Sequence, residues 1–286
     1  MNGIKIEMDK NKIHIELHLI KQAFIILLCV LFNGFILFAQ EKPTASAQEV
    51  ADKLSNPVSG MISVPLQGNL DYGIGSYNGS KYTTNIQPVL PINLSRKLNL
   101  ITRYIVPLVD QRDISAENTN QFGLSDATVS AFFTPVEKKH GIIWAVGPAF
   151  LIPIGTSDLL SARKWGIGPT ALLLKQSNGL TYGFLVNQIW SVAGAENRDE
   201  VNQMFLQPTF AKNFKSGAGL GLSSEINFNW QTGNTTADLI PSVSGVTKYG
   251  KQVVSMSIGP RIPLAGPASS RPDWGLRASL TFVFPK

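Results

Sequence analysis

Charged side chains that could act on a solute lie on the polar faces of segments that alternate apolar and polar residues. Arg103, Arg261 and Arg277 occupy such faces, as do Asp126 and Glu225. If these faces line one interior, the five groups share a channel in which fixed charge selects and orients solutes. The same charges could instead form a structural network that supports the wall, and we favour that interpretation for Arg277 and Asp126.

Uncharged polar residues extend the same faces. Five amides are predicted to form either a hydrogen-bonding track for a polar solute or simple hydrated filling: Gln87, Gln203, Gln207, Asn227 and Asn229. Val89, Ile101, Ile105 and Leu172 fall at inward positions too. The predicted lining is therefore mixed, which would suit a partly apolar solute.

The sequence offers few residues that could carry out catalysis. Downstream of the N-terminal leader described below, the chain has one histidine, His140, and no cysteine. A Ser-His hydrolase needs histidine beside serine, and zinc sites need His or Cys pairs. We therefore expect no enzyme, no cofactor and no such metal site. Loop carboxylates at 110–117 and 196–200 could bind calcium, although solvated loop charge is the ordinary explanation.

Strands are the elements that would position these residues. Trp274 to Phe284 alternates apolar residues with polar or small ones, and the pattern recurs from Gly60 onward. Each segment is near the length that a tilted transmembrane strand needs. We expect about twelve strands, over residues 60–72, 82–94, 97–109, 123–135, 141–153, 164–175, 180–191, 201–214, 219–230, 237–247, 252–264 and 273–284.

The connections between these segments alternate between short and long. Ser95-Arg96 is a short one, and Asp110 to Phe122 is a long one. An outer-membrane barrel has short periplasmic turns and longer outer loops, whereas a soluble sandwich has no reason to sort its loops in this way. Aromatic residues also fall near the segment ends, including all five tryptophans, as an interfacial girdle would place them.

Prolines occur inside the predicted strands, although proline gives no ladder donor and a closed barrel has no edges. They follow a local Gln-Pro or Gly-Pro form, as at Gln87 and Gly147, or stand alone: Pro88, Pro107, Pro148, Pro169, Pro208, Pro241 and Pro260. We interpret them as a weak repeat that marks bulges or local breaks in the ladder.

The N-terminal region has the form of an export leader. Lysines precede an apolar run from Ala23 to Phe38, and small residues follow it. We predict a signal peptide over residues 1–39, with cleavage as late as Ala47 as the alternative. Residues 40–59 would form a tether with a short helix, capped by Ser46 and Glu49, and residues 60–286 the barrel.

The composition limits the classes of partner that we expect. The net charge of +6 is spread along the chain and forms no stripe of basic residues with interleaved aromatics, so we expect no nucleic-acid partner. After the leader, no apolar run approaches the length of a membrane-spanning helix. Membrane insertion would then be by strands.

Several motifs resemble one bacterial family. They are KWGIGPT at 164–170, VNQMFLQP at 201–208, PDWGLR at 272–277 and FVFPK at 282–286. Together they resemble the family named for the MetA pathway of phenol degradation, whose members are often mislabelled neuromedin U or called transporters. The resemblance implies an outer-membrane barrel that admits small molecules, aromatic compounds among them. The family has no well-established functional residues to carry across.

These observations predict an all-β protein, a transmembrane antiparallel barrel of about twelve strands with a short N-terminal helix, in the cell outer membrane. We expect a monomer that passes small molecules passively, aromatic or partly apolar ones included. Its partners would be outer-membrane lipid, lipopolysaccharide, the barrel-assembly machinery and the solute. The alternatives are a structural or interaction barrel with a plugged lumen, and a lipid-modifying enzyme.

Overall fold

A computed structural model describes residues 46–250 and 252–284 as one helix and fourteen strands. The elements in chain order are α2 (Ala47–Leu54), β1 (Ile62–Ile74), β2 (Gly79–Ile86), β3 (Val89–Asn93), β4 (Leu98–Arg112), β5 (Asn120–Leu124), β6 (Ala127–Pro135), β7 (Ile142–Ile152), β8 (Lys164–Ser177), β9 (Leu180–Gly194), β10 (Asn202–Asn213), β11 (Ala218–Asn229), β12 (Asn234–Tyr249), β13 (Gln252–Ala265) and β14 (Trp274–Phe284). The predicted leader lies outside the described residues.

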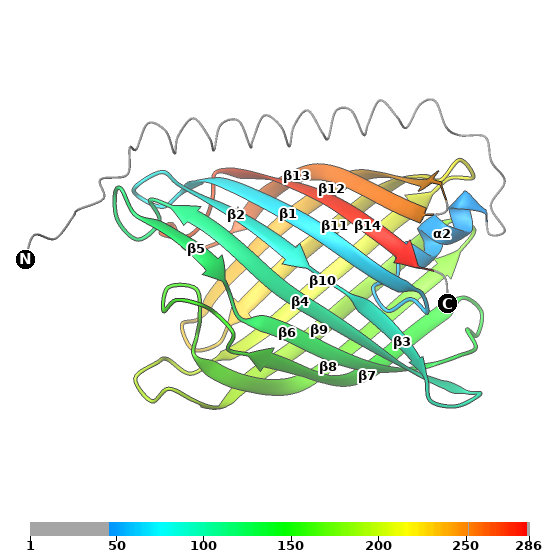
Figure 1. Cartoon of the computed structure of the whole chain (residues 1–286), viewed down its shortest axis with the longest axis horizontal. Helices are drawn as coiled ribbons and strands as arrows, with labels where there is room; N and C mark the ends of the chain where they lie inside the picture. Colours follow the sequence, from blue (N-terminus) through cyan, green and yellow to red (C-terminus); the bar gives the residue numbers. More distant parts are fainter. Residues whose placement is uncertain (1–45, 251, 285–286) are drawn as a thin grey trace, which may run out of the picture. The chain divides into compact units, whose positions relative to one another are not determined.

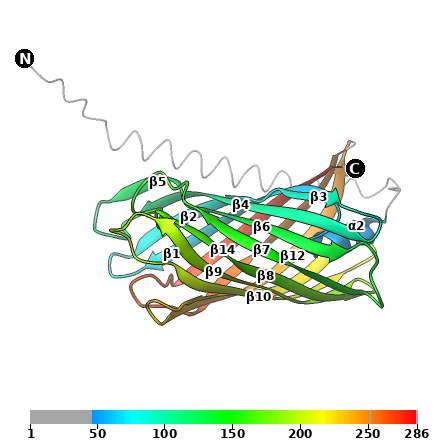
Figure 2. The same ribbon diagram turned by 90° about the horizontal axis from the view of Figure 1, so that it is seen from below.

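The strands form one closed antiparallel barrel. Neighbouring positions around the wall are paired in sequence order, and β14 pairs with β1 from Tyr72↔Trp274 to Ile62↔Phe284. β2 and β3 together fill one place beside β4, and β5 and β6 together fill the place on its other side, so fourteen strands make twelve positions. Figures 1 and 2 show the strands slanting around the barrel wall. The predicted fold class is confirmed.

The alternating sequence sorts side chains between the two faces of the wall, as strand geometry requires. In β11, Leu220 and Leu222 are 52% and 45% exposed although they are large and apolar, while Glu225 points to the other face. All five tryptophans are exposed by between 46% and 54%. Tyr72 stacks on Trp274 with ring centroids 5.0 Å apart. An apolar outer face with aromatics near the strand ends matches a lipid-facing wall.

The two barrel ends differ in their connections. The end that carries α2 has tight turns, such as 178–179 and 214–217, whereas the other end has longer loops, such as 153–163 and 195–201. Two outer connections, 75–78 and 230–233, are shorter than the sequence predicts. They are shorter because β2 and β12 each begin three residues earlier than expected, at Gly79 and Asn234, so that hairpins replace the predicted loops.

The prolines mark breaks in the ladder, as expected. β2 ends at Ile86 and β3 begins at Val89, with Gln87 and Pro88 between them. The register of β12 and β13 skips from Leu239↔Ile262 to Val243↔Ile258 around Pro241 and Pro260. A Cβ on Gly259 would collide with the backbone of Pro241, and one on Gly147 with the backbone of Ala131. Glycine before proline thus lets the neighbouring strand approach where the ladder is interrupted.

The predicted helix is present, and it lies at the end of the barrel with the tight turns (Figure 1). Ser46 and Glu49 form the expected capping box. Gln48 Nε2 donates to the backbone oxygen of Asn213 at 3.2 Å, and the Asn213 side-chain amide donates to Asp52 at 2.8 Å. No helix among the described residues has both the length and the apolar character needed to span a bilayer.

Lipid contact with the outer face predicts a depth-dependent penalty for charge. Leu222→Arg places a cation on the lipid side near the middle of β11 and should destabilise the barrel by about 2 to 4 kcal/mol. Urea unfolding in lipid vesicles would measure the difference. Ser223→Arg, at the next residue of β11 and on the inner face, is the depth-matched control and should change stability less. Equal effects at both positions would contradict a lipid-facing outer surface.

Candidate functional site

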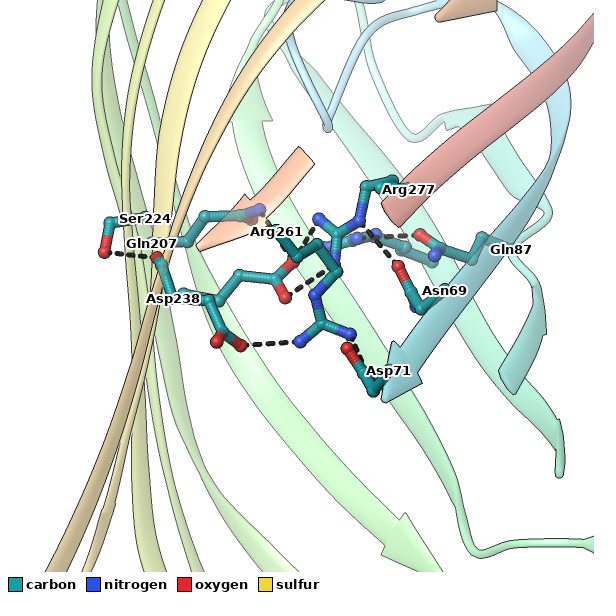
Figure 3. Close-up of polar contacts among 10 residues, drawn as sticks. Asn69, Asp71, Gln87, Gln207, Ser224, Asp238, Arg261 and Arg277 are labelled. Carbon is teal, nitrogen blue, oxygen red and sulfur yellow. Dashed lines mark hydrogen bonds and ion pairs between the residues drawn. The ribbon is translucent and has the colours of Figure 1, made fainter. Parts of the chain in front are cut away.

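An ion-pair network occupies the middle of the barrel interior, and Figure 3 shows its labelled members converging from different strands. Arg277 on β14 donates from Nη1 and Nη2 to the two carboxylate oxygens of Glu225 on β11, each at 2.7 Å. Its Nε donates to Asn69 Oδ1 on β1, also at 2.7 Å. This bidentate geometry, with the additional bond from Nε, engages all three nitrogens of the planar guanidinium and fixes its orientation.

A second arginine joins three strands. Arg261 on β13 donates to Asp71 on β1 at 2.9 Å and to Asp238 on β12 at 2.5 Å. Asp71 Oδ1 and Arg261 Nε are buried and have no hydrogen-bond partner among the described residues. Lys81 on β2 lies directly opposite Asp71 in the register, on the inner face. The group is therefore rich in charge but not fully saturated by hydrogen bonds.

Arg103 connects the opposite side of the barrel wall to the network. Its Nη2 donates to Gln87 Oε1 at 3.0 Å, and its charge interacts with the Glu225 carboxylate. β4 and β11, which carry these two charges, stand on opposite sides of the barrel in ladder order. Gln207 Nε2 lies 3.5 Å from Glu225 on the β10 side. Charge thus extends across the interior at this level.

Six of the ten residues singled out from the sequence meet in this network: Gln87, Arg103, Gln207, Glu225, Arg261 and Arg277. Sequence reasoning missed Asn69, Asp71, Lys81 and Asp238. Their alternation with apolar neighbours was a usable signal in β1 and β12. Lys81 was placed in a loop, because the start of β2 was set too late.

Asp126 lies apart from the network, in the break between β5 and β6. It accepts hydrogen bonds from the Ser161 hydroxyl at 2.6 Å and from the backbone nitrogens of Ala162 and Gly155 at 2.7 and 3.1 Å. These contacts hold the 153–163 connection, where Leu160 and Ser161 are buried. Asp126 therefore anchors an outer loop.

The remaining three predicted residues lie toward the outer end of the barrel. Gln203 and Asn227 share the inner face with Gln207 and Glu225, yet both are exposed to solvent. Asn229 accepts from the backbone nitrogens of Gln231 and Thr232 at 3.0 and 3.2 Å and so closes a turn. Exposure on the inner face indicates a hydrated entrance above the network.

An apolar layer lines the β3-to-β9 side of the interior toward the α2 end. Ile101, Phe132 and Leu172 are at most 2% exposed, and they form a cluster to which β3, β7 and β9 also contribute. Val58, from the segment between α2 and β1, packs into the same cluster and is 2% exposed. The N-terminal segment thus inserts an apolar side chain into the barrel below the charged network.

Loop charges at the outer end are paired locally. Lys164 Nζ lies 2.6 Å from Glu200, and the Ser191 hydroxyl donates to the same carboxylate. The Lys164 ammonium and then this hydroxyl hold the pKa of Glu200 below its usual value. Arg198 donates to the backbone oxygens of Asp158 and Ser161. Within the described part of the chain, no group of three or more His, Cys, Asp or Glu residues could hold a metal ion.

Comparison with known proteins supports the fold. No protein-family model and no curated protein matches the chain. An outer membrane channel from Pseudomonas putida F1 superposes with a TM-score of 0.63 at 12% identity, covering 79% of this chain and 96% of that one. Outer membrane phospholipase A from Escherichia coli gives a TM-score of 0.44 at 13% identity, covering 84% and 99%. The second value is too low to support a comparison of sites.

The barrel closure, the apolar outer face and the similarity to a solved outer-membrane barrel define the class of the protein. It is an outer-membrane β-barrel of twelve antiparallel strands with one short helix at the end that carries the tight turns. Its interior is layered, with a hydrated entrance, a central ion-pair network and an apolar layer closed by the N-terminal segment.

The Arg277–Glu225 pair permits a direct test of the network. Arg277→Met leaves the Glu225 carboxylate without its main partner and should destabilise the barrel by about 3 to 5 kcal/mol. Adding Glu225→Gln removes the unpaired charge and should restore most of the lost stability. Urea unfolding of the single and double variants in vesicles measures both effects. Additive losses would show that the two side chains are not coupled.

Proposed function

We propose that this protein is an outer-membrane channel for the passive passage of small molecules, aromatic and partly apolar ones included, and that the described conformation is its closed state. The observation that carries the proposal is the layered interior, in which a hydrated entrance leads to paired charges and then to an apolar layer. A wall built only for support has no need of exposed polar residues such as Gln203 and Asn227 on its inner face.

The central network would act as the selective layer. Fixed charges of both signs in a narrow, low-dielectric interior orient a polar solute and discriminate between ions. Barrels of about eight strands are filled by side chains, whereas barrels of roughly sixteen hold open channels. Twelve strands leave a lumen narrow enough for single side chains to contact a passing molecule.

The N-terminal segment would act as the closing element. Val58 lies in the apolar layer, and α2 is held by hydrogen bonds from Gln48 and Gln176 to backbone oxygens and from Asn213 to Asp52. These are few contacts compared with those of a wall strand. Release of the segment would leave the closed ladder intact while removing an apolar side chain from the lumen.

A barrel with a permanently plugged lumen is the second candidate, and the dense apolar layer is the observation that favours it. In that case the outer loops, tied together by Arg198 and by the Lys164–Glu200 pair, would be the functional surface. The two candidates differ in whether the interior can conduct once the N-terminal segment is gone.

Membership of the MetA-pathway family is part of this proposal. It rests on the sequence motifs at 164–170, 201–208, 272–277 and 282–286. The structure that superposes on this barrel is described as an outer membrane channel, which agrees with the proposed activity. We also propose that residues 1–39 are an export leader and that the mature protein is a monomer in contact with lipopolysaccharide.

Deletion of residues 46–59 should raise single-channel conductance in planar bilayers several-fold, because the deletion removes Val58 from the apolar layer. Val58→Asn in the full segment should give an intermediate increase, since the side chain keeps its size but loses its apolar contacts. Lys215→Gln, in a turn at the same barrel end, is the control. A barrel that is folded but equally non-conducting after the deletion would favour the plugged candidate.

Ion selectivity tests the role of the network. Arg103→Gln removes a lumenal cation that one hydrogen bond to Gln87 holds, so the channel should shift toward cation preference. Reversal potentials in a potassium chloride gradient, measured on the barrel lacking residues 46–59, would report the shift. Lys212→Gln removes an equal charge from the outer face and should leave the reversal potential unchanged. The same potential for Arg103→Gln and the parent would remove Arg103 from the conduction path.

A further inference from the structure

A cavity of about 610 Å³ opens at the barrel end that carries α2, between the N-terminal segment and the adjoining ends of β4, β6 and β7. Its volume lies in the range of small-molecule binding sites, which are typically about 300 to 1,000 Å³. One wall consists of residues 53–61, and the other includes the turn between β6 and β7. The cavity is separate from the charged network and takes up no residue of it.

The floor of the cavity is apolar. Val58, Ile101 and Ile143 line it, and these side chains are between 1% and 5% exposed over the whole protein. Burial of an apolar ligand surface against them would contribute about 25 cal/mol for each Å² removed from water. The floor therefore suits the hydrocarbon body of a small ligand, such as a single ring.

The rim of the cavity is basic. Lys53 in the last turn of α2 and Lys138 and Lys139 in the β6–β7 turn line it, together with one carboxylate, Glu137. None of the three lysines forms an ion pair with a described residue, and Lys138 Nζ donates only to the neutral Gln176 side chain, at 3.1 Å. Burial and then the nearby Lys53 charge lower the pKa of Lys138, against an opposing effect of Asp52. The rim is thus basic overall, with Asp52 and Glu137 as nearby carboxylates and none of its lysines held in an ion pair with a described residue.

A polar atom with no partner also lies in this wall. Asn99 Oδ1 is buried and accepts no hydrogen bond from the residues that the structure describes, and Asn99 lines the cavity beside Ile101. Buried acceptors are normally satisfied. A water molecule enclosed in the cavity beside a bound carboxylate would satisfy this oxygen.

We propose that this cavity is a binding site for small amphipathic organic anions, with the apolar body of the ligand on Val58, Ile101 and Ile143 and its carboxylate between Lys53 and Lys138. The combination of an apolar floor and unpaired cations at its edge selects against neutral molecules and against inorganic anions. The site spans two parts of the chain, so a ligand there stabilises the N-terminal segment against the wall. Binding at this site does not require that the barrel conduct.

The test uses 4-fluorobenzoate as the probe, titrated by fluorine NMR against the full barrel in lipid nanodiscs. Saturable binding is expected, with 4-fluorobenzamide, the neutral analogue, bound about tenfold or more weakly. Lys53→Gln and Lys138→Gln should each raise the dissociation constant about threefold to tenfold. Lys212→Gln, which also removes a lysine near this barrel end but outside the cavity, should leave it unchanged.

Three results would overturn the proposal: no saturable binding of the carboxylate, equal binding of the carboxylate and the amide, or equal loss from Lys212→Gln and Lys138→Gln. The variants lie in a turn, in α2 and near the end of β10, and gel mobility with and without heating checks that each barrel is folded. Conductance is measured separately, so a barrel that binds the anion but never conducts would contradict the channel and leave the binding site standing.

Discussion

Neutralisation of charge inside a closed wall is the constraint on which the rest of this structure depends. Lipid surrounds the barrel, so charged side chains away from the strand ends must turn inward, where little water shields them. Arg277, Glu225 and Arg261 meet this requirement by pairing across strands that are distant in sequence. The pairs also couple β1, β11, β12, β13 and β14 across strands that are not all neighbours in the ladder.

The interior contains an apolar cluster and a charged network, which stabilise the barrel in different ways. The apolar cluster around Phe132 and Leu172 resembles the core of a soluble domain, although here it lies inside a membrane barrel. The charged network contributes geometric specificity, because a bidentate arginine accepts only one arrangement of its partners. The apolar layer is tolerant of small rearrangement, whereas the network is not. The proposed opening of the lumen is therefore easier at the apolar layer, where Val58 is the part that does not belong to the wall.

Much of this fold could be predicted from the sequence, because a period of two residues is a strong signal when it is repeated around a whole barrel. The strand bounds in β13 and β14, the helix capped by Ser46 and the interruption at Pro88 all follow from local chemistry. The site was harder to predict. The contacts among inward residues depend on the register and tilt of every strand. The pairing of Arg277 with Glu225, and not with a nearer carboxylate, therefore has no local signature in the sequence. Lys81 was missed for a simpler reason, because β2 starts before the apolar alternation of that segment does. The role of Asp126 depends on a loop that folds back to it from 153–163, a long-range contact that alternation does not encode.

The broken ladder around the prolines has a mechanical consequence. The register skips beside Pro148 between β6 and β7 and beside Pro169 between β8 and β9, and similar gaps occur near Pro208 and between Pro241 and Pro260. These interruptions lie between the tight-turn end and the looped end of their strands, and they alternate around the wall with continuously paired junctions such as β9–β10 and β11–β12. Ladder pairing resumes on both sides of each gap. One rim of the cylinder can then widen or ovalise while the other keeps its outline, a freedom that a uniformly bonded wall of the same size would lack.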